Sequence, residues 1–269
     1  MKAGEASRFF VNGVALWSQR LPGWERARNV LAGREPAPEP QPRPAPQLLP
    51  PTERRRAPDT VAVALEAAFA ACQSAELPPA SLPCVFTSMH GDLSITDYMC
   101  ATVASTPTLV SPIRFHNSVH NAAAGYWSIG VECTRPYTAL SAGEQSFGAG
   151  LLETCAQAKH ANENVLLVAY DIDARGPLAP VARSKGILSA ALVISPSRGA
   201  KAIAKFDLEL VTGSGLVESR ARPENAALVA GNSTEACLPF MEALALGGHH
   251  ELLCLATPTL GLAIRLDPP

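Results

Sequence analysis

One short stretch constrains the fold more than any other. Residues 165–170 read VLLVAY and contain no charged side chain. An unbroken apolar run of this length, between polar neighbours, is typical of a strand that is buried on both faces. Such strands occur in sheets that helices cover on both sides, so we expect a layered α/β fold.

The segments before this run alternate between strand and helix patterns. Residues 60–75 place apolar side chains at helical spacing, and Asp59 precedes them as a candidate N-cap. Residues 146–161 repeat the pattern, with Phe147, Leu151 and Cys155 on one face. Short β-branched and aromatic runs predict three strands, over residues 9–17, 83–88 and 136–142.

The other segments are predicted from turn residues and periodicity. Residues 93–112 indicate a helix followed by a loop, and residues 115–129 indicate a single helix. Residues 186–195 indicate a strand, residues 202–212 alternate like another, and the turn residues between them predict an antiparallel hairpin. A short helix over 235–246 and a last hairpin of 251–256 with 260–266 complete the prediction.

Proline dominates residues 36–51 and occupies every second position from Pro36 to Pro46. Proline lacks the N–H that helices and sheet ladders require, so we expect an extended surface loop there. A proline-rich recognition motif is the alternative. We treat residues 1–269 as one domain, since the length suits one substantial core.

Charge and cysteine usage narrow the class of protein. The formal net charge is −2, which gives no broad attraction to nucleic acid or to anionic membranes. Arg54, Arg55 and Arg56 form the one basic cluster, which we interpret as a solvated loop end. We expect neither a membrane span nor a secretory signal. The seven scattered cysteines indicate reduced thiols in a cytoplasmic protein.

The sequence lacks the glycine and histidine spacings of common cofactor and nucleophile motifs, and we expect no cofactor. His116 and His120 are four residues apart, so one helix would place both imidazoles on one face as a possible metal pair. Glu132 or Asp92 would have to supply a third ligand. The simpler interpretation is that both histidines are polar residues at a packing or subunit interface, and we expect no metal.

Residues 138–152 place a predicted strand, a sharp turn and a predicted helix in succession. Such a junction puts one side chain and its neighbouring backbone N–H groups at the positive end of a helix, where a nucleophile is activated. The turn holds Glu144, Gln145 and Ser146 but no cysteine. Ser146 suits an N-cap; as a nucleophile it would need a base such as His116 or His120.

Several segments resemble the ketosynthase branch of the thiolase superfamily. FFVNGVALWS resembles the opening strand of ketosynthases, and RRRAPDTVAVALEAAFAAC resembles their first long helix. FHNSVHNAAAGYWSI, at residues 115–129, is similar to the short family of ketosynthase-like N-terminal domains. Members of that family occur beside fatty-acid-like enzymes for aryl polyene and xanthomonadin-type pigments.

The resemblance implies a truncated thiolase-like fold, namely the N-terminal half of a ketosynthase with a short C-terminal hairpin region. It places the family's acylated cysteine within one residue of Gln145, and Glu144-Gln145 resembles the Glu-Gln pair of type II polyketide chain-length factors. Two further catalytic histidines of active ketosynthases lie in a second half that the sequence is too short to hold. His249 and His250, in a Gly-Gly-His-His turn, suit a loop.

We therefore expect a non-catalytic partner that pairs with an active ketosynthase, meets acyl carrier protein through that complex and shapes an acyl tunnel. Interface or tunnel-lining candidates by resemblance are Gln145, Ser146, Phe147, His116, Asn117, His120, Asn121 and Trp127. Phe147 would be a wall of the tunnel, although packing against Leu151 in the core is an equal alternative.

Two other classes of function remain open. The chain could be an acyltransferase or thioester hydrolase that uses Ser146 with a nearby histidine, or a relocated cysteine such as Cys133 or Cys155. The apolar position of Cys155 favours an inert thiol. It could also be a stand-alone binding module for acyl carrier protein, which would require a local basic patch.

Overall fold

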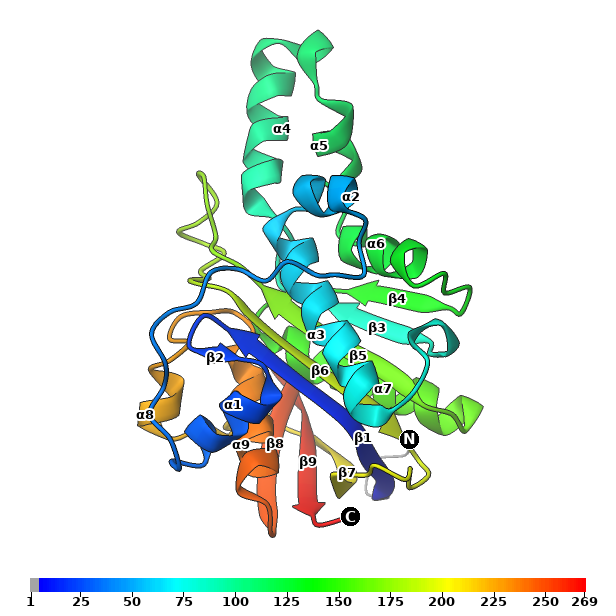
Figure 1. Cartoon of the computed structure of the whole chain (residues 1–269). Coiled ribbons are helices and arrows are strands. Elements are labelled where there is room, and N and C mark those ends of the chain that lie inside the picture. The colour runs from blue at the N-terminus through cyan, green and yellow to red at the C-terminus, as the bar shows by residue number, and fades with distance from the viewer. Residues whose placement is uncertain (1–4) are drawn as a thin grey trace.

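The computed structural model describes residues 5–269, which form a nine-stranded sheet flanked by helices (Figure 1). The strand order is β4-β3-β5-β6-β1-β7-β9-β8, and β2 pairs with β1 alone. The strands are β1 Ser7–Ser18, β2 Leu21–Pro22, β3 Cys84–Thr87, β4 Tyr137–Leu140, β5 Val165–Asp171, β6 Leu188–Ser195, β7 Ala204–Thr212, β8 His250–Thr257 and β9 Leu260–Asp267. The helices are α1 Trp24–Leu31, α2 Pro51–Arg56, α3 Asp59–Ala75, α4 Leu93–Ser105, α5 Pro112–His116, α6 Ala122–Gly130, α7 Ser146–Ala161, α8 Pro223–Ala226 and α9 Leu238–Leu246.

The predicted layered α/β fold is confirmed. Every residue of β5 is buried, as the apolar run indicated, and β5 lies between β3 and β6. β3 pairs in parallel with both β4 and β5, whereas β6 runs antiparallel to β5 and β1. Helices α3 and α6 pack on one face of this part of the sheet and bury Trp127 against it.

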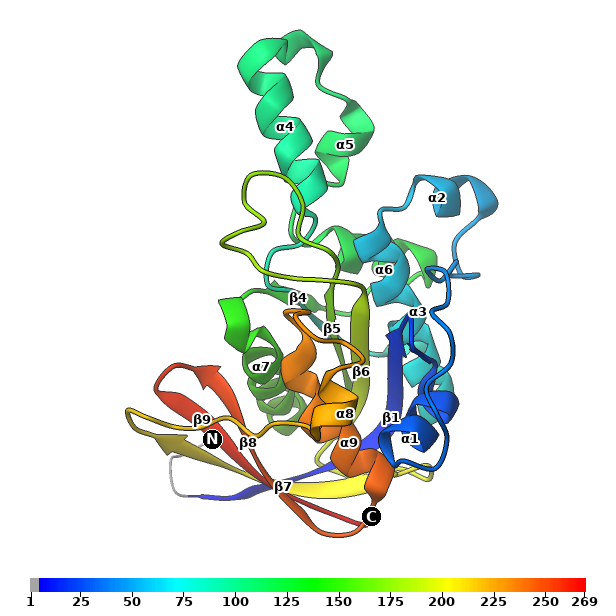
Figure 2. The same cartoon turned by 90° about the vertical axis from the view of Figure 1, so that its left-hand side faces the viewer.

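The sheet has a separate hydrophobic core on the side of α7 and α9, where its strands bend. β1 is long enough to pair with β6 along its C-terminal part and with β7 along its N-terminal part. The strands β7, β9 and β8 therefore turn away from the rest of the sheet (Figure 2). Helices α7 and α9 lie inside this bend, and a Cβ at Gly148 of α7 would stand 2.1 Å from the carbonyl oxygen of Leu255 in β8. Only glycine allows the two backbones to approach this closely.

The two long helices agree with the prediction to within a residue, but Asp59 is not the N-cap. α7 spans Ser146–Ala161 as predicted, and α3 begins at Asp59 itself. Pro58 takes the N-cap position because its fixed φ is pre-set for an extended entry to the helix. The Asp59 carboxylate lies in the first turn and pairs with Arg43 Nη1 at 2.9 Å.

The hairpin predicted between residues 186–195 and 202–212 is wrong. β6 and β7 are strands, but β1 lies between them and pairs with both. The connecting loop passes the end of this three-strand arrangement and is held by Asn12, whose Oδ1 accepts from Gly199 N at 2.9 Å. Turn residues between two strands predict a reversal of the chain, but they do not exclude a third strand in the gap.

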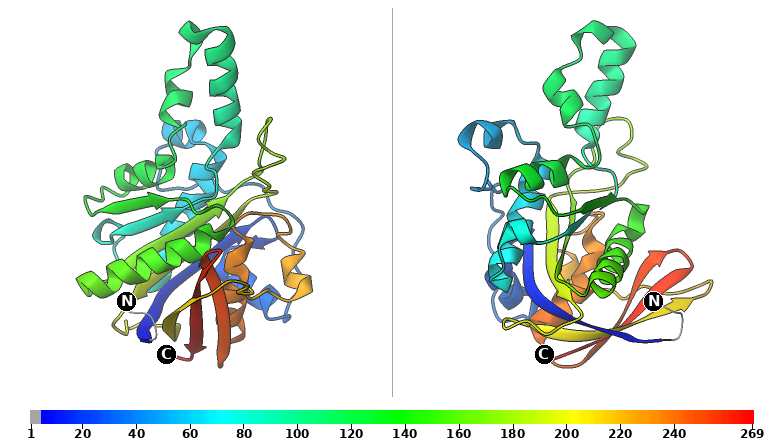
Figure 3. Two further views of the ribbon diagram at one scale, coloured as in Figure 1. Left: turned by 180° about the vertical axis from the view of Figure 1, so that it is seen from behind. Right: turned by 90° about the vertical axis from the view of Figure 1, so that its right-hand side faces the viewer.

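The single helix predicted over residues 115–129 is also wrong. α5 ends at His116 and α6 begins at Ala122, with turns between them. The Ser118 hydroxyl donates to Phe115 O at 2.8 Å, a local bond that competes with helical pairing. His116 and His120 therefore do not share one helical face. α4 and α5 form an arm that projects beyond the sheet (Figures 1 and 3).

Residues 36–50 of the proline-rich segment form neither helix nor strand, and Pro51 is the first residue of α2. Within the described residues, no helix combines the length and apolar character needed to cross a membrane.

Candidate functional site

The predicted strand-turn-helix junction is present where β4 leads into α7. A short 3-10 turn over Gly143–Gln145 connects them, and Gly143 adopts a positive φ of 60°. The Thr87 hydroxyl at the end of β3 donates to Ser146 O at 2.9 Å, which fixes the first turn of α7 against the sheet. The N-terminus of α7 therefore meets the carboxyl ends of the parallel strands, the usual place for a ligand site in α/β folds.

Ser146 is buried at this junction, and its hydroxyl is occupied locally. Ser146 Oγ donates to Gly143 O at 2.6 Å and accepts from Ala142 N at 3.0 Å. These bonds close the turn, so the side chain acts like a cap one position inside the helix. A serine nucleophile needs a base to take its proton, and here a backbone carbonyl holds that proton.

Gln145 occupies the N-cap position of α7, and its backbone N donates to Ala142 O at 3.2 Å. The Gln145 side chain is half-buried, whereas Glu144 is exposed and lines a neighbouring cleft. An amide has no thiolate to acylate, so the position that the resemblance assigns to cysteine carries no nucleophile here.

The cleft beside the junction has a volume of about 870 Å³. Its walls come from the turn at Glu144, from Met89 after β3 and from segments 216–223 and 231–239. Its lining mixes apolar side chains with five charged ones, namely Glu144, Glu218, Glu235, Arg183 and Arg220. Burial raises the pKa of Glu218 above its usual value, and the charge of Glu144 adds to this effect.

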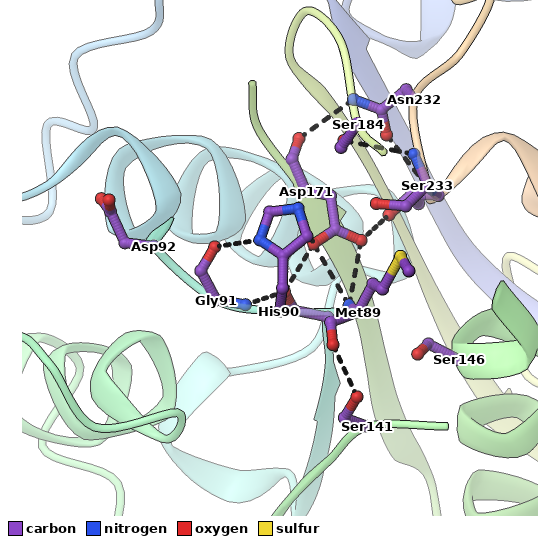
Figure 4. A network of polar contacts seen from close by, with 12 residues as sticks. Met89, His90, Gly91, Asp92, Ser141, Ser146, Asp171, Ser184, Asn232 and Ser233 are labelled. Atoms are coloured by element: carbon purple, nitrogen blue, oxygen red, sulfur yellow. Dashed lines mark hydrogen bonds and ion pairs between the residues drawn. The ribbon is translucent and has the colours of Figure 1, made fainter. Parts of the chain in front are cut away.

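A buried polar network forms one end of the cleft and centres on Asp171, the last residue of β5 (Figure 4). Its carboxylate accepts from Ser88 Oγ at 2.6 Å, from Thr234 Oγ1 at 2.9 Å and from Met89 N at 3.1 Å. Asn232 Nδ2 donates to Asp171 O at 3.3 Å. These bonds join the ends of β3 and β5 to the 232–234 segment, so they hold that cleft wall in place.

His90 lies against this network. Its Nδ1 lies 2.9 Å from Gly91 O, and its Nε2 lies 4.0 Å from Asp171 Oδ1. The imidazole is almost fully buried, and Nε2 has no hydrogen-bond partner among the described residues. Ser146 lies apart from this imidazole in the same view, and its hydroxyl bonds to Gly143 O and Ala142 N instead (Figure 4).

The two histidines considered as a metal pair have separate partners. His116 packs edge-on against Tyr126, and His120 Nε2 lies 3.0 Å from Leu140 O. Asp92, a proposed third ligand, instead caps α4 by accepting from Ser94 N and Ile95 N. In residues 5–269, no group of three or more histidine, cysteine or acidic side chains could hold a metal ion. His249 pairs with Asp267 at 2.8 Å near the last hairpin.

The other candidates are split between surface and core. Asn121 Nδ2 donates to the Tyr137 hydroxyl at 3.0 Å and ties the start of α6 to β4. Asn117 is buried at the end of α5. Trp127 of α6 is fully buried between that helix and the sheet. Phe147 is 2% exposed, and its ring packs edge-to-face against Phe240. This burial is typical of a core residue.

The thiols offer no alternative nucleophile within the core. Burial raises the pKa of Cys72 and of Cys84 to about 12, and it raises the pKa of Cys155 further. A thiol with a raised pKa is protonated and therefore unreactive. Cys133 is also buried, and its Sγ donates to Leu82 O at 3.6 Å.

The Asp171 network was not predicted from the sequence. A signal was present, because Asp171 follows the buried run 165–170, and Ser88 and His90 follow the strand predicted over 83–88. Polar side chains at the carboxyl ends of adjacent parallel strands converge on one edge. Thr234 and Asn232 carried no such signal, because a distant loop brings them in.

Comparison with known proteins agrees with this geometry. Residues 24–242 match the model of the family "Beta-ketoacyl synthase, N-terminal domain". That match covers most of the chain, so the protein belongs to this family. A comparison with curated proteins found no match.

Solved structures show the same fold. A chain in the complex of the ketosynthase ApeO with its chain length factor ApeC, from Xenorhabdus doucetiae, is 18% identical. The TM-score is 0.67, and the match covers 98% of this chain and 99% of that one. A chain of AntDE:AntF, a type II polyketide synthase acyl-carrier protein in complex with its ketosynthase, is 12% identical with a TM-score of 0.70. It covers 98% of this chain and 100% of that chain.

Larger ketosynthases match over part of their length. The ketosynthase from module 6 of the Bacillus subtilis bacillaene synthase is 11% identical with a TM-score of 0.54. That match covers 80% of this chain but 43% of the other. The fold is therefore the thiolase-like α/β fold, shortened relative to a full ketosynthase.

Proposed function

We propose that this chain is a non-catalytic, chain-length-factor-like subunit that pairs with an active ketosynthase in the cytoplasm. The observation that carries the proposal is the chemistry of the junction between β4 and α7. The resemblance assigns the family's acylated cysteine to about Gln145, where this turn has no cysteine, and the neighbouring Ser146 hydroxyl is engaged by Gly143 O and Ala142 N. A junction of this kind keeps the shape of a ketosynthase without its nucleophile.

The edge strand β4 supports a partner on this side of the molecule. Cys84 N donates to Pro136 O and Ser88 N donates to Leu140 O, so alternate residues of β4 face β3. The backbone groups of Tyr137 and Ala139 then face outward, and β4 has no second neighbour among the described strands. A partner strand can add to such an edge.

Exposed apolar side chains gather on the arm formed by α4 and α5, on the turn after it, on α6 and on β4. Soluble surfaces rarely keep so many large apolar groups. These residues are Val103, Leu109, Ile113, Phe115, Val119, Ile129 and Tyr137. Obligate interfaces are large and apolar, so this surface suits a permanent partner.

The proposed consequence is a shared acyl tunnel for an aryl polyene-like chain, delivered on acyl carrier protein to the complex. His116, Asn121 and Tyr137 lie on the side that would face the partner, and Trp127 supports this surface from the core. Phe147 lies in the other core, against Phe240. The ApeO and ApeC complex offers a precedent for a pair of this kind.

The test is co-expression with the ketosynthase encoded nearest to this chain, followed by size-exclusion chromatography and a malonyl-carrier condensation assay. We expect a 1:1 complex whose activity requires both chains and survives Gln145→Ala and Ser146→Ala. Acyl transfer by this chain alone that disappears with Ser146→Ala would contradict the proposal and restore the acyltransferase or hydrolase alternative.

A further inference from the structure

The arm formed by α4 and α5 is joined to the sheet at its root. It leaves through residues 88–92, which follow β3, and it returns through residues 117–121, which lead into α6. Much of the exposed apolar surface proposed for the partner lies on this arm. The groups that fix the root therefore decide where that surface points.

The outgoing half of the root converges on the carboxylate of Asp171. Ser88 Oγ accepts from Gly91 N at 2.8 Å, so its own proton goes to Asp171 Oδ1 at 2.6 Å. Met89 N donates to both carboxylate oxygens, at 3.1 and 3.2 Å. Since these groups all donate, the Asp171 oxygens act as acceptors, which is the role of an ionised carboxylate.

This carboxylate needs a positive partner. Asp171 is 1% exposed, and a buried charge without a counter-ion is costly. Within residues 5–269, no lysine or arginine lies within 4.0 Å of its oxygens, and His90 Nε2, at 4.0 Å from Oδ1, is the one basic group at that distance. His90 is therefore the candidate counter-ion.

Both ring nitrogens of His90 face oxygens that can only accept (Figure 4). Nδ1 lies 2.9 Å from Gly91 O, and Nε2 faces the Asp171 carboxylate. A neutral imidazole has one N–H, so it would turn a lone pair toward one of these oxygens, whereas the imidazolium offers an N–H to each. At 4.0 Å the Nε2 contact is a charge pair rather than a hydrogen bond.

The same network also reaches the arm through a second segment. A Cβ at Gly176 would lie 2.8 Å from Asp97 Cβ, so the loop over residues 172–187 touches α4. Asn232 Nδ2 donates to Lys185 O at 3.0 Å, which ties this loop to the network. A change at Asp171 is therefore expected to act on both supports of the arm.

The other titratable side chains on the elements around this pair have different positions or partners. Asp92, Asp173 and Glu235 each accept from a backbone N–H. His120 Nε2 faces a single carbonyl, Leu140 O, which a neutral ring satisfies. The full set is Asp92, His120, Glu144, Asp173, Lys185 and Glu235. Among residues 5–269, Asp171 is the one acidic group within 4.0 Å of a His90 ring nitrogen.

We propose that His90 is a positioning residue, held as an imidazolium against Asp171, and that this charged pair fixes the direction of the arm. The inference rests on the proposed function, because the arm carries the surface for the ketosynthase. Loss of the His90 proton leaves the Asp171 charge buried and unpaired, which loosens the root. Ketosynthase binding therefore weakens as the pH rises through the titration of His90.

The first test measures ketosynthase affinity by surface plasmon resonance between about pH 6 and about pH 9. We expect wild-type binding to weaken roughly tenfold over this range. His90→Gln keeps a side-chain donor but cannot titrate, so it should bind weakly throughout and show little pH dependence; Asp171→Asn should do the same. His249→Gln is the matched control, because His249 pairs with Asp267 at 2.8 Å on the exposed last hairpin. It should keep the wild-type profile.

The second test uses the chain alone, so it separates this inference from the proposed function. With nitrogen-15 in the histidines, both ring nitrogens of His90 should carry protons at about pH 6, and loss of the signal in His90→Gln assigns it. Amide hydrogen exchange over residues 93–116 should be faster in His90→Gln, relative to α7 in the same chain.

A neutral His90 ring at that pH, unchanged exchange in the arm, or a wild-type pH profile in His90→Gln would overturn the proposal. Absence of any complex would contradict the proposed function, and the ring and exchange measurements would then decide this inference by themselves.

Discussion

β4 and β8 are the two edge strands of one sheet, yet their outward-facing backbone groups have different partners. On β8, Leu253 N donates to Ser219 Oγ and Leu255 N donates to Glu218 Oε1, both at 2.9 Å. Ser219 N also donates to Leu253 O at 2.9 Å. β4 has no such cover from the described residues.

One chain can therefore leave one edge of its sheet open while a loop covers the other edge. An uncovered strand edge invites further pairing, and proteins usually block it with side chains or a loop. The segment before α8 blocks β8 by using one hydroxyl and one carboxylate. The open edge at β4 carries the exposed Tyr137, and α6 and the projecting arm add further exposed apolar side chains, which suits the partner that we propose.

The largest expected effect comes from Ala139→Pro in β4. Proline removes the outward N–H of Ala139 and places its ring where a partner strand would pair, but it spares the bonds to β3. We expect ketosynthase binding to weaken roughly 100-fold, with little change in the thermal unfolding of the isolated chain. Thr138→Pro is the contrast, because its N–H faces β3 and its loss should destabilise the fold. An intact complex with Ala139→Pro would remove β4 from the interface.

The next effect concerns the apolar surface beside that edge. Expressed alone, the chain should self-associate or be poorly soluble, because this surface lacks its partner. Phe115→Asp with Ile129→Asp, at positions 61% and 76% exposed, should yield a monomer in sedimentation velocity. Val217→Asp is a matched control, since Val217 is 77% exposed beside the covered edge. If the wild-type chain alone is a stable monomer, the apolar surface does not need a partner, which would contradict the proposed interface.

A smaller effect is expected where β8 is covered. Ser219→Ala and Glu218→Ala each leave a strand N–H without its acceptor, which should lower the free energy of unfolding by about 1 kcal/mol per site. Urea denaturation measures this loss, and Glu251→Ala serves as an exposed control on the same strand. Ketosynthase binding should not change, so weakened binding would show that the two edges are not independent.

The smallest effect is a pH dependence from Glu218. Burial raises its pKa in the folded chain, and the charge of Glu144 adds to this, although the bond from Leu255 N opposes it. A carboxyl with a raised folded pKa binds its proton more tightly when folded. Its contribution to stability is therefore complete below the unfolded pKa and is lost as the pH rises through the folded pKa.

Glu218→Gln keeps an oxygen acceptor for Leu255 N but removes the titration. Between about pH 4 and pH 7, the wild-type chain should lose more unfolding free energy than this variant. Chemical denaturation at several pH values measures the difference. Parallel pH profiles for the two proteins would show that Glu218 does not titrate differently on folding.

Local patterns predicted much of the fold. The apolar run of β5, the helical spacing of α3 and the strand-turn-helix junction before α7 are encoded within a few neighbouring residues. The predicted helix over 115–129 failed because side-chain bonds such as Ser118 Oγ to Phe115 O interrupted a helical composition. The metal alternative depended on that helix, so it lost its geometric basis with the break.

The site was predicted only in part. Gln145 and Ser146 lie at the junction where the sequence placed them, but the Asp171 network was not foreseen. Thr234 reaches Asp171 from 63 residues away, and no local pattern records a contact of that kind. Phe147 is buried against Phe240, which fits the core alternative, and its role as a tunnel wall stays a prediction.

The sequence alone yielded the order of the longer strands and helices, the buried strand β5 and the absence of cysteine from the turn before α7, but not α1, α2, β2 or α8. These features follow from side-chain periodicity and residue chemistry over short distances. Only the tertiary structure decided that β1 lies between β6 and β7, that β8 is covered and that β4 is open. Strand neighbours are selected by packing between distant segments, and that choice leaves no mark on either segment alone.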